Sequence, residues 1–101
     1  MTKPGPKAPQ DAYEAIFTGL AHPVRRRILM SVFFEGGSMT AGEIAALFEH
    51  AWPTTTRHLR SLEAAKLLRH TREGRTQVYT LDPRPLELVR DWLASLTRPA
   101  K

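Results

Sequence analysis

Two helix signals separated by a short turn constrain the middle of the chain. The segment TAGE at residues 40–43 has the form of a capping box, in which the threonine oxygen accepts from one free backbone N–H and the glutamate reaches back to another. Ile44, Leu47 and Phe48 follow at the spacing of one apolar helix face. Pro53 suits the first position of a second helix, because its missing N–H has no partner there anyway. The pattern predicts a helix-turn-helix.

The second helix has two unlike faces. Its predicted core-facing stripe consists of Thr55, Leu59, Leu62 and the aliphatic stem of Lys66. The opposite face carries short hydroxyl side chains followed by arginines. Such side chains hydrogen-bond to base edges and phosphates, and the major groove of a DNA duplex admits one α-helix. The predicted DNA-contacting residues of this helix are Pro53, Thr54, Thr56, Arg57 and Arg60.

A basic hairpin follows. Residues 67–72 and 75–81 are predicted strands, and the glycine of the intervening Glu73-Gly74 can take the positive φ of a tight turn. Arg72 and Arg75 lie at the predicted tip and complete the predicted DNA-binding set. Between residues 53 and 81 six basic residues stand against two acids, a local charge of +4 out of the chain's +5. Positive charge is therefore concentrated where phosphates would lie.

Taken together, these residues resemble the ArsR/SmtB-type winged-helix transcriptional repressors. The resemblance rests on GLAHPVRRRIL at residues 19–29, TRHLRSL at 56–62, KLL at 66–68 and EGR at 73–75. It covers residues 11–97 and is specific as a combination of motifs. It implies a small homodimer that binds double-stranded operator DNA until an effector, often a metal ion, releases it.

The chain departs from that family in its turn and in its metal motif. Glu49-His50 stands where the family usually has glycine and an aliphatic residue, and Thr55 replaces a usual buried valine. The chain has no cysteine, so the family's thiolate site has no counterpart. The predicted last helix offers only Glu87 and Asp91 and no histidine. We therefore predict no metal site and no cofactor, and the sequence does not identify an effector.

The terminal helices, predicted over residues 12–21 and 84–97, each carry an apolar stripe. A helix over 23–34, a glycine stop at Gly36-Gly37 and a strand near 38–40 lie between the first stripe and the helix-turn-helix. The apolar surface of the two stripes is larger than one small core can cover, which indicates pairing with a second copy of the chain. The predicted dimer-interface residues are Tyr13, Ile16, Phe17, Leu20, Val89, Trp92, Leu93 and Leu96.

The predicted fold is a mainly α domain with a small antiparallel β wing, a winged helix-turn-helix that dimerises through its terminal helices. It occupies residues 11–97, between a flexible basic tail at 1–10 and another tail at 98–101. A chain of 101 residues supports one modest core, and a pI near 10.2 favours a polyanionic partner. No segment has the pattern of a signal peptide or a membrane span, so a cytoplasmic protein is expected.

Each functional interpretation has a competitor. Arginines on the second helix can form an ordinary solvated face, and those of the hairpin can keep an edge strand soluble. A winged helix can also bind another protein, although such versions tend to expose apolar or acidic residues at this helix. An enzyme needs a nucleophile with a base, paired carboxylates, a phosphate-binding loop or a metal set. None is assembled here, so no catalytic residue is predicted.

The remaining polar and aromatic residues are expected to be structural. Within the run 25–27, one arginine is expected to pack its stem against the core and another to pair with an acid. His22 is expected at a helix start, and His58 as a packed, hydrogen-bonded side chain. Trp52 is expected to clamp the start of the second helix. No two histidines have the i, i+4 spacing of a zinc-binding helix face.

Overall fold

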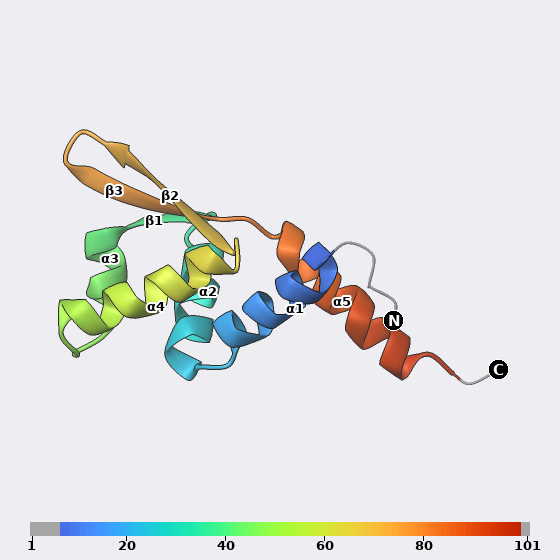
Figure 1. The fold of residues 1–101 in the computed structure, drawn as a ribbon. Helices are drawn as coiled ribbons and strands as arrows, with labels where there is room; N and C mark the ends of the chain where they lie inside the picture. The colour runs from blue at the N-terminus through green and yellow to red at the C-terminus, as the bar shows by residue number, and fades with distance from the viewer. Residues whose placement is uncertain (1–6, 100–101) are drawn as a thin grey trace.

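Helices dominate the structure, a computed structural model that describes residues 7–99 and their side chains from residue 12 onward. Within this range the elements are α1 (Lys7–Leu20), α2 (Pro23–Phe34), β1 (Ser38–Thr40), α3 (Ala41–Ala45), α4 (Trp52–Ala64), β2 (Leu68–Glu73), β3 (Thr76–Leu81) and α5 (Arg84–Thr97) (Figure 1). None of the helices in this range is long and apolar enough to cross a membrane. The predicted mainly α fold with a small β wing is confirmed.

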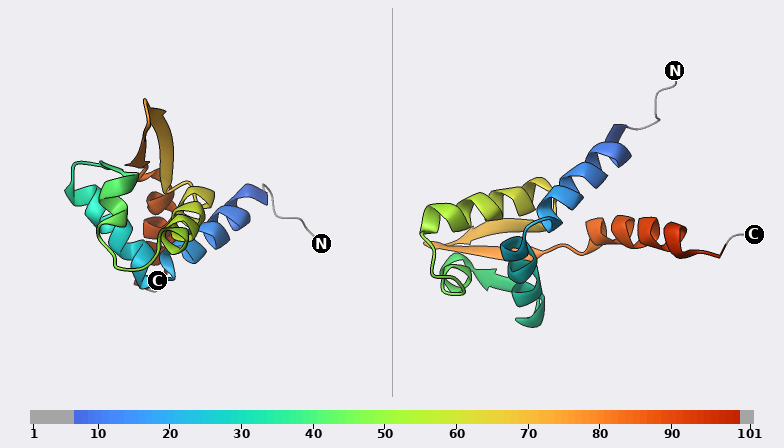
Figure 2. Two further views of the ribbon diagram at one scale, coloured as in Figure 1. Left: turned by 90° about the vertical axis from the view of Figure 1, so that its left-hand side faces the viewer. Right: turned by 90° about the horizontal axis from the view of Figure 1, so that it is seen from below.

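The three strands form an antiparallel sheet in the order β1-β3-β2. Met39 of β1 lies opposite Tyr79 of β3, and both side chains are buried. The two-residue loop Gly74-Arg75 joins β2 to β3, and Gly74 has a φ of 66°. The hairpin projects from the body of the molecule at one end, while α1 and α5 extend together at the other (Figures 1 and 2).

Local signals set most element boundaries. His22 is the N-cap of α2, and its Nδ1 accepts from the Val24 N–H at 3.1 Å. Gly36 and Gly37 follow α2 with φ of 95° and 105°, a conformation open to glycine. The predicted capping box of α3 is present, because Thr40 Oγ1 accepts from the Glu43 N–H at 3.1 Å and Glu43 accepts from the Thr40 N–H at 2.9 Å.

The core lies where α4 meets α1, α2 and the sheet. Thr55, Leu59 and Leu62 of α4 are buried as predicted. Ile16 of α1 is also a core residue, only 1% exposed. Its prediction as a dimer contact is therefore wrong, because its side chain is already covered within one chain. By contrast, α5 has no fully buried residue.

Two predicted boundaries are corrected. α1 begins at Lys7, so residues 7–10 of the predicted tail are helical, while residues 1–6 lie outside the described residues. α3 ends at Ala45, and the next residues form a tighter turn in which the Leu47 N–H donates to the Ile44 carbonyl at 3.0 Å. Arg98 and Pro99 follow α5 outside any helix or strand, and residues 100–101 are not described.

The arginine run of α2 ties the helices together through neutral acceptors. Arg25 Nη2 donates to the Thr18 carbonyl at 2.9 Å, and Arg26 Nη1 donates to the Leu20 carbonyl at 2.8 Å. These carbonyls belong to the last turn of α1, where carbonyl oxygens lack N–H donors from within the helix. The Arg27 guanidinium lies 5.0 Å from the centre of the Phe48 ring. In residues 12–99 none of these three arginines forms the expected ion pair with an acid.

Lys66 ends α4 in an unusual conformation. Its φ is 63°, and it is the one non-glycine residue in the described range with a positive φ. The Lys66 N–H donates to the Glu63 carbonyl at 2.9 Å and the Leu67 N–H to the Leu62 carbonyl at 3.0 Å, the two bonds of a Schellman motif. Lys66 is exposed, and Ala65 occupies the end of the core stripe instead. The predicted packing of the Lys66 stem is therefore wrong.

Replacing Lys66 with glycine should stabilise the fold. A left-handed conformation costs an L-residue about 1–2 kcal/mol, a cost that glycine avoids. Part of this gain is lost, because glycine has greater conformational freedom in the unfolded chain. We expect Lys66→Gly to raise the free energy of unfolding by about 0.5–1 kcal/mol in urea denaturation. Lys66→Ala removes the same charge but keeps Cβ, so it should give no such gain. Equal stabilisation by alanine would contradict the conformational explanation.

Candidate nucleic-acid interface

The outward face of α4 carries arginines and small side chains. Arg57 and Arg60 are exposed, and exposed Pro53 and Ala64 lie on the same side of the helix. Thr54 and Thr56, also predicted to contact DNA, are half-buried and flank this face. The Thr56 hydroxyl is buried and has no hydrogen-bond partner among the described residues. The helix thus presents a narrow ridge with two arginines, bordered by threonines.

The other two predicted arginines lie at the hairpin tip, Arg72 near the end of β2 and Arg75 in the loop before β3. Arg72 and Arg75 are exposed, and Arg72 Nε donates to the Gly74 carbonyl at 3.2 Å. Arg75 and Trp52 line one hollow of about 380 Å³ between the tip and the start of α4. Trp52 is 45% exposed, so it covers the start of α4 only in part. Figure 1 shows the tip and the start of α4 at the same end.

The charges of this surface are uncompensated. Among the described residues, ion pairs involve Arg69, Arg84 and Arg90 but none of the four arginines on α4 and at the hairpin tip. Glu63, the acid on α4, is paired with His70 of β2. We define the basic surface as Arg57, Arg60, Arg72 and Arg75. Its guanidinium groups are free to neutralise phosphates.

A cluster of histidines lies behind this surface, and the sequence did not reveal it. The ring centres of His22 and His58 are 4.4 Å apart, and those of His50 and His58 are 6.2 Å apart. Arg25 Nη1 lies 3.4 Å from His58 Nδ1 and donates to Ser61 Oγ at 3.1 Å. Burial, then the neighbouring His22 and Arg25, lower the pKa of His58, which favours its neutral form. The expectations of His22 at a helix start and of His58 as a packed side chain are confirmed.

These histidines are not arranged as a metal site. In residues 7–99 no group of three or more histidine, cysteine, aspartate or glutamate side chains is placed to hold a metal ion. Two of the three imidazoles already use a ring nitrogen locally: His22 Nδ1 accepts from a backbone N–H, and His50 Nε2 lies against Thr55. The cluster therefore serves the packing of α2 against α4.

The two residues that depart from the family pattern, His50 in the turn and Thr55 in α4, contact each other. His50 Nε2 lies 2.9 Å from Thr55 Oγ1, and Thr55 is 1% exposed. The His50 ring stacks on Phe48, with ring centres 4.9 Å apart and planes 8° apart. A buried hydroxyl needs a partner, and the histidine of the turn supplies it. The polar residue in the core and the histidine of the turn therefore form one hydrogen-bonded pair.

This pairing predicts a non-additive effect on stability. His50→Ala leaves the Thr55 hydroxyl buried without a partner, at a cost of about 1–3 kcal/mol in the free energy of unfolding. Adding Thr55→Val removes the hydroxyl, so the double variant should recover a large part of that loss. The measurement is a double-mutant cycle by urea denaturation. Strictly additive losses would show that the two side chains do not depend on each other.

Known proteins share both this sequence pattern and this fold. Residues 20–71 match a family model described as a helix-turn-helix domain. The transcriptional repressor SdpR of Bacillus subtilis is 33% identical over 78 residues, which cover 77% of this chain and 84% of SdpR.

Two solved structures agree in fold. An ArsR-family transcriptional regulator superposes with a TM-score of 0.80 at 28% identity, covering 96% of this chain and 93% of that one. A "possible transcriptional regulator for arsenical resistance" superposes with a TM-score of 0.69 at 31% identity, covering 85% and 83%. These relatives are transcriptional regulators and not enzymes. The chain belongs to the helix-turn-helix family and is a DNA-binding transcriptional regulator of the ArsR/SmtB type.

Proposed function

We propose that the chain is a homodimeric repressor that binds an inverted-repeat operator through α4 and the hairpin. The observation that carries this proposal is the basic surface, whose four arginines lie on α4 and at the hairpin tip and have no acidic partner among the described residues. Repression rather than activation is supported by the 33% identity to SdpR, which is a transcriptional repressor. Because such a regulator acts on DNA, we also propose a cytoplasmic location.

Within the basic surface we assign two roles. Arg57 projects from the exposed ridge of α4, the element that fits a major groove, and so we assign it to base edges. Pro53 and Ala64 on the same ridge are small enough to allow close approach, with Thr54 and Thr56 at its edges. The hairpin arginines lie outside that ridge and are assigned to phosphates, where they set affinity without reading sequence.

The two roles predict different effects of arginine removal. Arg57→Ala should cost about 1–3 kcal/mol of specific binding, measured by fluorescence anisotropy on operator and on scrambled duplex. Arg75→Ala should weaken both duplexes alike and reduce the salt dependence of binding by about one unit on a log–log plot. Both side chains are exposed, so circular dichroism should be unchanged. Wild-type operator affinity in Arg57→Ala would refute the assignment of α4.

The dimer proposal is supported by the apolar side of α5. Phe17 of α1 contacts Trp92 edge-to-face, with ring centres 5.2 Å apart, so the two helices pair within one chain. Trp92, Leu93 and Leu96 nevertheless remain 41%, 49% and 65% exposed. Figure 2 shows α1 and α5 extending away from the body, where a second copy can reach them. A row of large, exposed apolar side chains such as this is typical of a protein–protein interface.

The remaining predicted dimer contacts have partly covered side chains. They are Tyr13, Phe17, Leu20 and Val89, each half-buried within the chain. We propose that they form the edge of the interface, with the exposed stripe of α5 at its centre. A two-fold dimer would place two α4 helices about one turn of DNA, roughly 34 Å, apart, which is why we propose an inverted-repeat operator.

A charge on the apolar side of α5 should separate the dimer. We expect Leu93→Glu to sediment as a monomer at micromolar concentration, because a carboxylate in an apolar interface loses its hydration. Ala94→Glu is the matched control: it adds the same charge one residue along, on the side of α5 that already carries Glu87 and Asp91. It should remain dimeric. A wild-type protein that is monomeric at this concentration would overturn the proposal.

A further inference from the structure

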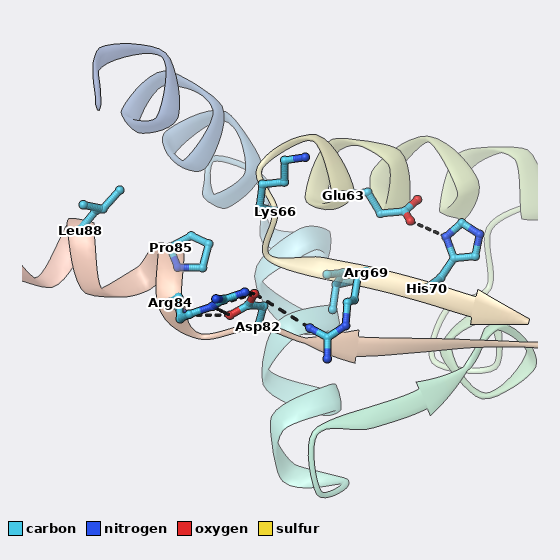
Figure 3. A pocket seen from close by; sticks show the side chains of 9 residues that line it. Glu63, Lys66, Arg69, His70, Asp82, Arg84, Pro85 and Leu88 are labelled. Atoms are coloured by element: carbon cyan, nitrogen blue, oxygen red, sulfur yellow. Dashed lines mark hydrogen bonds and ion pairs between the residues drawn. The ribbon is translucent and has the colours of Figure 1, made fainter. Parts of the chain in front are cut away.

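A hollow of about 900 Å³ lies where the end of α4, the start of β2 and the start of α5 meet. Figure 3 shows Lys66 on one side of it and Arg69 and Arg84 on the other, with Leu88 at one end. It lies at the opposite end of α4 from the hairpin tip (Figure 1). None of the four arginines of the basic surface lines the hollow.

The carboxylates that line the hollow are already engaged. Glu63 pairs with His70, and Asp82 accepts from Arg84 Nη2 at 2.7 Å and from the Arg84 backbone N–H at 3.0 Å. The hydrogen bonds from Arg84 lower the pKa of Asp82 to about 2, so it is ionised at neutral pH. Both acids of the lining are thus already paired with groups of the same chain.

Two cations of the hollow retain unused hydrogen-bond donors. Lys66 has no side-chain hydrogen bond or ion pair among the described residues. Arg69 is 62% exposed and has one distant ionic contact, at 3.9 Å from Asp82. Ammonium and guanidinium groups bind carboxylate and phosphate oxygens, guanidinium often through two parallel bonds. The hollow thus has cationic donors that remain available for anionic oxygens.

The rest of the lining is apolar. Leu68, Pro85 and Leu88 complete the hollow, and Leu88 is 37% exposed although it is a large aliphatic residue. Sites for small organic molecules combine such apolar walls with a few polar groups that orient the ligand. A bare inorganic ion would leave this wall unused. An organic anion would use both parts of the lining.

The backbone of Lys66 adds an independent observation. A lysine occupies the left-handed position at the end of α4, where glycine is the common residue and would be less strained. Local strain is concentrated at functional sites, where the side chain matters more than the conformational cost. Lys66 lines the hollow on the side opposite Arg69 and Arg84 (Figure 3).

We propose that this hollow binds a small organic dianion carrying two carboxylate or phosphate groups. Lys66 holds one anionic group and Arg69 the other, on opposite sides, while the carbon frame lies against Pro85 and Leu88. The site joins α4 and β2, which carry arginines of the basic surface, to α5, which carries the proposed dimer interface. A ligand bound there contacts both parts of the molecule, the position an effector requires.

Phthalate is a suitable probe, since it carries two carboxylates on an apolar ring. We expect ¹H–¹⁵N NMR titration of the full chain to shift the amides of Lys66, Leu68, Arg69 and Arg84, with a dissociation constant of about 1 mM or lower. The neutral isostere phthalamide, at matched ionic strength, should produce no such shifts. Shifts confined to Arg57, Arg72 and Arg75 would instead indicate general anion attraction to the basic surface and would overturn the proposal.

Variants test the assigned groups. Lys66→Gly and Arg69→Gln should each weaken phthalate binding at least about fivefold, whereas Lys66→Arg should retain it. Since Lys66→Gly is expected to be more stable than wild type, its loss of binding would not reflect misfolding. Arg90→Gln, which removes an exposed arginine outside the hollow, is the matched control and should bind like wild type.

DNA is the competing source of anionic oxygens. If the hollow binds a free ligand, Lys66→Gly and Arg69→Gln should leave the salt dependence of duplex binding unchanged. A slope reduced by about one unit in either variant would mean that these groups contact DNA phosphates, and would overturn the proposal. Unchanged phthalate affinity in both variants would overturn it as well. These outcomes are independent of whether the basic surface binds an operator.

Discussion

Burial of one stripe of α4 determines what this protein can present to DNA. Thr55, Leu59 and Leu62 are at most 1% exposed, so the rotation of α4 about its axis is set by the core. Helical spacing then places Arg57 and Arg60 on the opposite, solvated side. A different rotation would bury a guanidinium without a partner, at a cost of several kcal/mol. The recognition face is thus a consequence of core packing.

Arginines serve two distinct purposes in this small fold. Two of those on α2 are used within the fold: Arg25 and Arg26 donate to the last carbonyls of α1, and Arg25 also donates to Ser61 of α4. This network holds three helices together without using an acid. Those of the basic surface have no acidic partner in residues 12–99. The same residue type therefore stabilises the scaffold in one place and leaves charge available for phosphates in another.

Every described helix and strand was predictable from sequence, because each has a local signal. The capping box at Thr40, Pro53 at the start of α4 and the glycines after α2 act within a few residues of the chain. Other features could not be predicted locally. The pattern of α1 does not show that Ile16 is covered by its own core, and the pattern of α4 does not show that Lys66 takes a left-handed conformation. The pairing of His50 with Thr55 and the hollow beside Lys66 likewise exist only in three dimensions.

Salt dependence of binding to duplex DNA tests the central claim most directly, because it counts the phosphates that the protein neutralises. If the basic surface of each subunit in a dimer engages DNA, the affinity should fall steeply between 50 and 200 mM salt. The log–log slope should then be about −4 or steeper, near −0.9 for each phosphate neutralised. A slope near zero, or retention on DNA that does not change with salt, would contradict the assignment of α4 and the hairpin as the DNA-binding surface.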